Sequence, residues 1–144
     1  MKLLISALFS SSPQRLCPAH RDSDITSVLG AIGAAEKFVY VAVMDYFPVT
    51  IYQKEPQFYP RVDDALRKAA IERGVEVRLL LSNWTDTRPA MLHYLQSLTA
   101  IDQPDKNISV KGRYFQVPSN VSQAKIPFAR VNHNKYIVTD RSGH

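Results

Sequence analysis

Three residues near the end of the chain have the types and spacing that could do chemistry together. His133, Lys135 and Asp140 follow the pattern H-x-K-x-x-x-x-D. On an extended strand, residues two apart point to the same side, so the imidazole and the ammonium would project together. An imidazole can act as a nucleophile or proton carrier near neutral pH. An ammonium neutralises charge that builds up on phosphate oxygens, so the pair predicts attack on a phosphodiester, with Asp140 fixing the local geometry by hydrogen bonding.

The alternative is that His133 is a turn residue and Lys135 a solvated charge at a strand edge. At average composition, the full three-residue spacing should arise by chance in only about one in a hundred chains of this length. The motif also lies between two hydrophobic segments, residues 128–131 and 136–138, which we expect to be strands. The context therefore favours the catalytic interpretation.

The elements that must position this motif follow a simple order along the chain. Apolar residues at helical spacing predict helices over residues 25–36, over 62–73, and from near Pro89 to residue 98. Apolar and β-branched runs predict strands over residues 38–44, 75–81, 108–117 and 136–139. The strand at 38–44 has the composition of one buried on both faces. This alternation predicts an α/β fold, with a buried β-sheet flanked by helices.

Composition limits what such a chain can be. The 144 residues suit one domain, and 45% hydrophobic with 22% charged residues excludes global disorder. A single cysteine, Cys17, excludes a disulfide-stapled miniprotein. The formal charge of +5 allows an anionic partner without requiring one. We divide the chain into a linker-like segment, residues 1–18, and a catalytic lobe, residues 19–144, which we expect to be truncated after the motif.

The segment from Val131 to Asp140 resembles the HKD signature of the phospholipase D superfamily. The similarity extends beyond the signature. Residues 10–18, 43–48, 62–80 and 126–133 resemble the C-terminal catalytic half of one branch, the animal lumenal phospholipase D-like 5′ exonucleases. Members of that branch act on single-stranded nucleic acid in acidic compartments. The resemblance covers nearly the whole chain, from Ser10 to Asp140.

This resemblance implies a two-lobed enzyme with one HKD motif in each lobe. One histidine attacks phosphorus to form a phosphohistidine, and the other protonates the leaving oxygen and later activates water. The two lysines supply the positive charge, so the resemblance implies no metal and no other cofactor. His133 would be one of the two histidines, either the nucleophile or the acid–base, and Lys135 one of the two phosphate-binding lysines.

The sequence departs from the branch in three ways. It has no first HKD motif, it ends at His144 before the Gly-Ser/Thr-x-Asn segment, and it lacks the membrane anchor of the branch. The second motif would come from a missing part of the chain or from a homodimer. Two functional alternatives to the exonuclease therefore stay open, namely phospholipase D or transphosphatidylase activity on phospholipids and a catalytically inactive fragment. A third is a nucleic-acid binder driven by the positive charge, whose affinity would fall steeply with salt.

Three residues are candidates for substrate contact. Tyr46 and Phe47 lie in an aromatic loop, residues 45–60, and single-stranded nucleic-acid sites often stack bases on such rings. The alternative is that these rings pack against their own domain. Arg130 precedes His133 by three residues and could face the phosphate, although a salt bridge at a strand edge would also explain it.

Three tripeptides fit the acceptor pattern for N-glycosylation, at Asn83, Asn107 and Asn120. Their number in a short chain favours a history in the secretory pathway, although accidental matches in a cytosolic protein are the alternative. With the branch resemblance, we expect the lumen between the endoplasmic reticulum and the lysosome. An unpaired Cys17 fits a lumenal protein only if its partner lies outside this chain.

Overall fold

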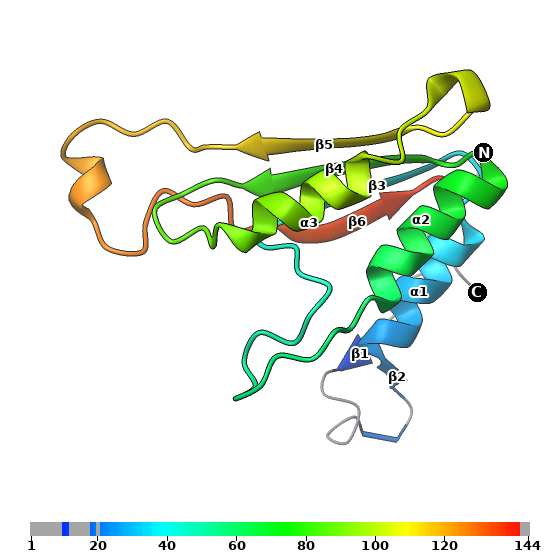
Figure 1. Cartoon of the computed structure of the whole chain (residues 1–144). Helices are drawn as coiled ribbons and strands as arrows, with labels where there is room; N and C mark the ends of the chain where they lie inside the picture. Colours follow the sequence, from blue (N-terminus) through cyan, green and yellow to red (C-terminus); the bar gives the residue numbers. More distant parts are fainter. Residues whose placement is uncertain (1–9, 12–17, 20, 142–144) are drawn as a thin grey trace, which may run out of the picture.

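The computed structural model describes residues 10–11, 18–19 and 21–141 of the chain. Most of the segment predicted as a linker, including Cys17, lies outside these residues. In chain order, the helices and strands are β1 (Ser10–Ser11), β2 (Asp22–Ser23), α1 (Asp24–Ala34), β3 (Phe38–Val43), α2 (Arg61–Arg73), β4 (Glu76–Ser82), α3 (Ala90–Thr99), η2 (Pro104–Lys106), β5 (Val110–Phe115), η3 (Gln123–Lys125) and β6 (Lys135–Thr139) (Figure 1). None of the helices in this described part has the length and hydrophobicity needed to cross a bilayer.

The main sheet has four strands in the order β5-β4-β3-β6. β3, β4 and β5 are parallel, as the helical crossovers between them require, and β6 runs antiparallel to β3. In this register Val43 pairs with Lys135, and Val39 pairs with Thr139. The start of β6 therefore lies at the edge of the sheet where the parallel strands end. The predicted α/β fold, a sheet with flanking helices, is confirmed.

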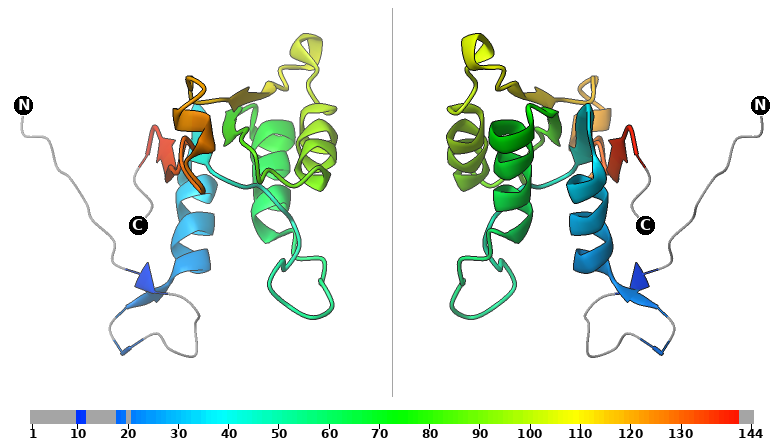
Figure 2. Two further views of the ribbon diagram at one scale, coloured as in Figure 1. Left: turned by 90° about the vertical axis from the view of Figure 1, so that its left-hand side faces the viewer. Right: turned by 90° about the vertical axis from the view of Figure 1, so that its right-hand side faces the viewer.

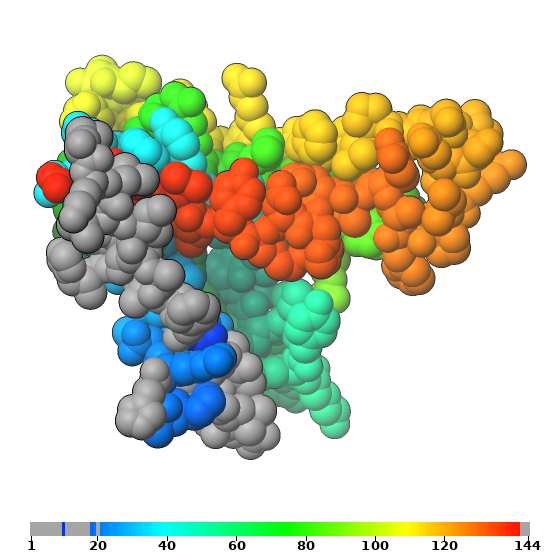
Figure 3. Space-filling view, turned by 180° about the vertical axis from the view of Figure 1, so that it is seen from behind, coloured from blue at the N-terminus to red at the C-terminus, as the bar shows by residue number. Residues whose placement is uncertain are grey.

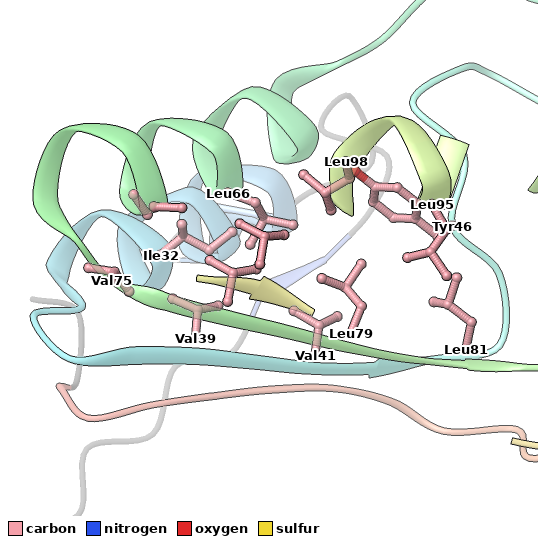
Figure 4. Close-up of a cluster of buried hydrophobic side chains, with 14 of the residues drawn as sticks. Ile32, Val39, Val41, Tyr46, Leu66, Val75, Leu79, Leu81, Leu95 and Leu98 are labelled. Atoms are coloured by element: carbon pink, nitrogen blue, oxygen red, sulfur yellow. The ribbon is translucent and has the colours of Figure 1, made fainter. Parts of the chain in front are cut away.

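The core lies between the sheet and the three α-helices, which occupy the same side of it (Figures 2 and 4). Alternate residues of the central strands point into this layer, among them Val39 and Val41 of β3 and Leu79 and Leu81 of β4. Ile137 of β6 packs against the same cluster. Burying one aliphatic side chain of this kind stabilises a fold by about 1.5–3 kcal/mol, so the core holds β6 and the parallel strands together.

The opposite face of the sheet is more open than the sequence predicted. β3 was expected to be buried on both faces, but Phe38 and Tyr40 are only half-buried there. Tyr136 and Val138 of β6 are exposed. Seen from behind, β6 runs across the surface and the segment before it projects to one side (Figure 3). The three α-helices all lie on the core side of the sheet, so no helix of the described residues covers this opposite face.

The segment before β6 also differs from the prediction. Residues 128–131 were expected to form a strand, but no strand forms between β5 and Lys135. Phe128 and Arg130 both have left-handed backbone conformations, with φ of 55° and 57°. Residues in this conformation cannot continue an extended strand. β5 is likewise shorter than the expected 108–117, because Ile108 instead pairs with Gln103 in an isolated bridge.

Candidate active site at the carboxyl edge of the sheet

The two motif residues lie at the start of β6, where β3 and β4 end. Lys135 is the first residue of β6 and pairs with Val43, the last residue of β3. His133 lies two residues earlier, outside the strand, so the alternation rule used in the prediction does not apply to it. Both residues are exposed. The Lys135 Nζ donates a hydrogen bond to the His133 carbonyl oxygen at 3.3 Å, which brings the ammonium close to the histidine backbone.

A buried hydrogen bond fixes the backbone just before the histidine. Ser82, the last residue of β4, is fully buried, and its hydroxyl donates to the Asn132 carbonyl oxygen. A buried hydroxyl costs free energy unless it finds a partner, so this contact constrains Asn132 as well as satisfying Ser82. The position of His133 is thus tied to a strand in the middle of the sheet.

Asp140 lies at the other end of β6. Its Oδ1 accepts hydrogen bonds from the backbone N–H groups of Glu36, Lys37 and Phe38, at 3.1, 3.0 and 3.2 Å. Partial burial of the carboxyl would raise its pKa, but these N–H donors outweigh it and hold the pKa of Asp140 below its ordinary value. The five residues of β6, at about 3.3 Å each, lie between His133 and Asp140, so the two residues are at opposite ends of the strand. Its geometry supports a positioning role.

Arg130 connects the segment before the motif to the segment after β5. Its Nε donates to the Ser119 hydroxyl at 3.3 Å, and its Nη2 donates to the Pro118 carbonyl oxygen. No salt bridge of Arg130 occurs among the described residues. A guanidinium has five donors, so these two contacts leave others for an anion. The predicted substrate contact by Arg130 stays a prediction.

The structure places the Tyr46 ring in the core. Tyr46 is 8% exposed and donates its hydroxyl hydrogen to the Asp63 carboxylate, which also pairs with the Arg67 Nε at 2.7 Å. Arg67 in turn reaches the Ser97 carbonyl oxygen at 3.1 Å. Burial raises the pKa of Tyr46, and the hydrogen bond to Asp63 raises it further. In this arrangement Tyr46 joins its loop to α2 and α3.

Phe47 is half-buried and meets the Tyr94 ring edge-to-face, with the ring centroids 5.9 Å apart. Both aromatic residues chosen from the sequence thus pack against their own domain here. Base stacking by either of them stays a prediction.

Two aromatic residues near the motif were not chosen from the sequence. Trp84 follows β4, and Phe128 lies in the turn that includes Pro127. Both line a groove together with Arg130. Trp84 is the middle residue of the predicted glycosylation tripeptide at Asn83, and residues 128–131 were expected to form a strand. The neighbouring Pro127 was the available signal that residue 128 lies in a turn.

The three predicted glycosylation positions, Asn83, Asn107 and Asn120, are all exposed. Asn107 has a left-handed backbone and lies against Gly74. Exposure is a requirement for glycosylation and does not establish it, so modification at these positions stays a prediction. Within the described part of the chain, no three His, Cys, Asp or Glu side chains lie close enough to hold a metal ion.

Comparison with known proteins agrees with the family resemblance. Residues 4–120 match the family model described as "PLD3/4, PLD-like domain". This match covers most of the chain, so the protein belongs to this phospholipase D-like family. The matched residues end before His133 and begin inside the segment predicted as a linker.

Three relatives of the chain are named as 5'-3' exonucleases. The chain is 46% identical to the mouse 5'-3' exonuclease PLD4 over 139 residues, which are 96% of this chain and 27% of that protein. It is 43% identical to the human 5'-3' exonuclease PLD3 over 136 residues, 94% of this chain and 28% of that protein. It is 46% identical to the Xenopus laevis 5'-3' exonuclease PLD3 over 132 residues, which are 92% of this chain and 27% of that protein. The chain thus spans little more than a quarter of the curated relatives it matches, in their C-terminal part.

Proposed function

We propose that this chain forms one half of the active site of a 5′ exonuclease that hydrolyses single-stranded nucleic acid. The observation that carries the proposal is the His133–Lys135 pair, exposed at the carboxyl edge of the sheet and joined by the 3.3 Å contact. Ligands of open α/β sheets bind outside the carboxyl ends of the strands, so the pair lies where this architecture places substrates. The relatives named as 5'-3' exonucleases support the same reaction class.

The proposed reaction runs in two steps. In the first, a histidine nitrogen bonds to phosphorus while the P–O bond to the leaving group breaks, and a second histidine donates a proton to the leaving oxygen. In the second step, the histidine that donated the proton takes a proton from water, and the water oxygen displaces the other histidine from phosphorus. Lys135 neutralises the non-bridging oxygens in both steps. His133 is one of the two histidines.

The second histidine and lysine come from a further part of the protein or from a second copy of this chain. Among the described residues the other histidine is His93, an exposed residue of α3 with no lysine two positions on. One set of side chains cannot be both nucleophile and acid in the same step. We therefore treat the site of this chain as a half-site.

Replacing His133 by alanine in the complete protein tests the proposal. We expect cleavage of a 5′-labelled single-stranded oligonucleotide to fall by at least about 1,000-fold, because the variant loses a nucleophile or a proton carrier. His133 is exposed, so thermal melting should show an unchanged fold. His93→Ala, which removes an exposed histidine from a helix surface, is the control and should cleave normally.

Retained cleavage by His133→Ala would remove this residue from the mechanism. A parallel assay with phosphatidylcholine vesicles separates the substrates. Lipid hydrolysis that depends on His133, without oligonucleotide cleavage, would assign the site to the phospholipase alternative instead.

A further inference from the structure

A groove lies beside the motif, between the loop that follows β4 and the segment that follows β5. It is lined by residues 83–86, 116–119 and 124–130 and has a volume of about 610 Å³. In Figure 1 the segment after β5 extends away from the sheet and then returns to the start of β6. We call this feature the β4–β5 groove.

The lining of the β4–β5 groove combines aromatic rings with an excess of cations. Trp84 and Phe128 supply the rings, and Lys125 and Arg130 supply two positive charges against the single carboxylate of Asp86. Phe128 is 82% exposed, so its ring is accessible to a ligand in the groove. Aromatic rings that stack bases, combined with cations that hold the backbone, are the means by which proteins bind single-stranded nucleic acid.

The polar groups of the groove keep capacity for a ligand. Lys125 forms no salt bridge within the described part of the chain, and Arg130 uses only its Nε and Nη2 there. Each of these is a donor, and a phosphodiester strand offers acceptors.

The β4–β5 groove is held in a fixed relation to the motif. Ser82 bonds to Asn132, and the Trp84 backbone N–H donates to the Thr87 hydroxyl at 2.9 Å, which restrains the loop after β4. Arg130 lies three residues before His133, so their Cα atoms are at most about 11 Å apart. A strand whose phosphate reaches His133 can therefore also enter the groove.

We propose that the β4–β5 groove binds a nucleotide next to the scissile phosphate, with its base on Trp84 and Phe128 and its phosphate on Lys125 and Arg130. This inference rests on the proposed function and adds the site of strand binding to it. Asn83 borders the same groove, so a glycan there would compete with the nucleotide. The experiment therefore uses protein from a host that adds no N-glycans.

The chain carries its own probe, because Trp84 is its only tryptophan. In a His133→Ala background, which prevents cleavage, tryptophan emission is followed while oligothymidylate is added. We expect the emission to be quenched, since the base lies on the indole ring. Phe128→Ala should weaken the binding about tenfold, as expected for the loss of one stacked ring. Arg130→Gln should weaken it and lower its dependence on salt.

Val121→Ala is the matched control. Val121 lies in the same segment and is 77% exposed, but it does not line the groove, so its truncation should leave binding unchanged. Unchanged emission on addition of the oligonucleotide, or equal affinity of the Phe128→Ala chain, would overturn the groove assignment. Neither outcome affects the proposed function, because that depends on His133-dependent cleavage in the complete protein.

Discussion

Asp140, the last residue of the motif, contacts the backbone at the start of β3. It lies at the far end of β6 from His133 and holds three consecutive backbone N–H groups at the start of β3. These groups precede or begin a strand, and the carboxylate gives all three a protein acceptor. By accepting from them, Asp140 fixes β6 against β3. The register then places Lys135 opposite the end of β3.

Replacing Asp140 by asparagine should therefore lower stability in a pH-dependent way. The pKa of Asp140 is lowered in the folded protein, so its contribution is complete well above the ordinary aspartate value. That contribution is lost as the pH falls through the folded pKa, below about 4. We expect the difference in melting temperature between the two proteins to be largest at pH 7 and to shrink at pH 3.

Asp105→Asn is the control for this experiment, because Asp105 is exposed in η2 and accepts no hydrogen bond within the described residues. It should show no such pH-dependent difference. A difference for Asp140→Asn that stays constant from pH 7 to pH 3 would contradict the charged role of this carboxyl.

At the scale of elements, helix ends decide where the strands begin. α2 ends at Arg73 and is capped by Gly74, which has a φ of 65°. The Val75 N–H donates to the Ala69 carbonyl oxygen at 3.1 Å. This left-handed cap turns the chain directly into β4. A Cβ at position 74 would lie 2.4 Å from the Asn107 Nδ2. The missing side chain of Gly74 therefore leaves room for Asn107, in the turn before β5.

Gly74→Ala should destabilise the fold by at least about 1–2 kcal/mol, the cost of a left-handed backbone for a residue with a side chain. The contact with Asn107 adds to this cost.

Gly30→Ala in α1 is the opposite case, because a Cβ there meets nothing within 4 Å. It should stabilise the fold by about 0.5–1 kcal/mol. Urea unfolding measures both, and equal stability of Gly74→Ala and the original chain would contradict the role of the cap.

The elements also show how far local sequence patterns reach. The helices over α1 and α2 and the strands β3 and β4 were predicted to within about two residues, because apolar periodicity and Gly74 define them locally. The segment before β6 was predicted wrongly, because the composition of residues 128–131 is typical of a strand. The left-handed residues Phe128 and Arg130, with the contacts of Arg130 to Pro118 and Ser119, hold it in a turn instead.

For the whole molecule, the decisive feature is that the motif lies at an open edge. His133 and Lys135 are exposed there, and the sheet face formed by β3 and β6 is only partly covered by described residues. Two exposed residues, linked through the contact of the Lys135 Nζ with the His133 carbonyl oxygen, leave room for a substrate and for a second set of side chains. The structure is thus compatible with the two-set reaction that we propose.

This arrangement predicts how the 144-residue chain behaves by itself. As a monomer it should bind oligonucleotides but not cleave them, because one imidazole cannot serve both catalytic roles. Sedimentation, combined with a cleavage assay on the same sample, checks this. An active symmetric dimer would identify a second copy as the source of the missing groups, whereas cleavage by the monomer would refute the half-site.

The sequence by itself determined the types and spacing of the proposed catalytic residues, the family, and most of the helices and strands. These properties depend on residues close together in the sequence, so local sequence patterns are enough to predict them. Only the tertiary structure decided that β6 pairs with β3, that Tyr46 is buried against Asp63, and that Trp84 and Phe128 meet in one groove. Each of these joins residues far apart in the chain, and such contacts are selected by the packing of the whole core rather than by any local pattern.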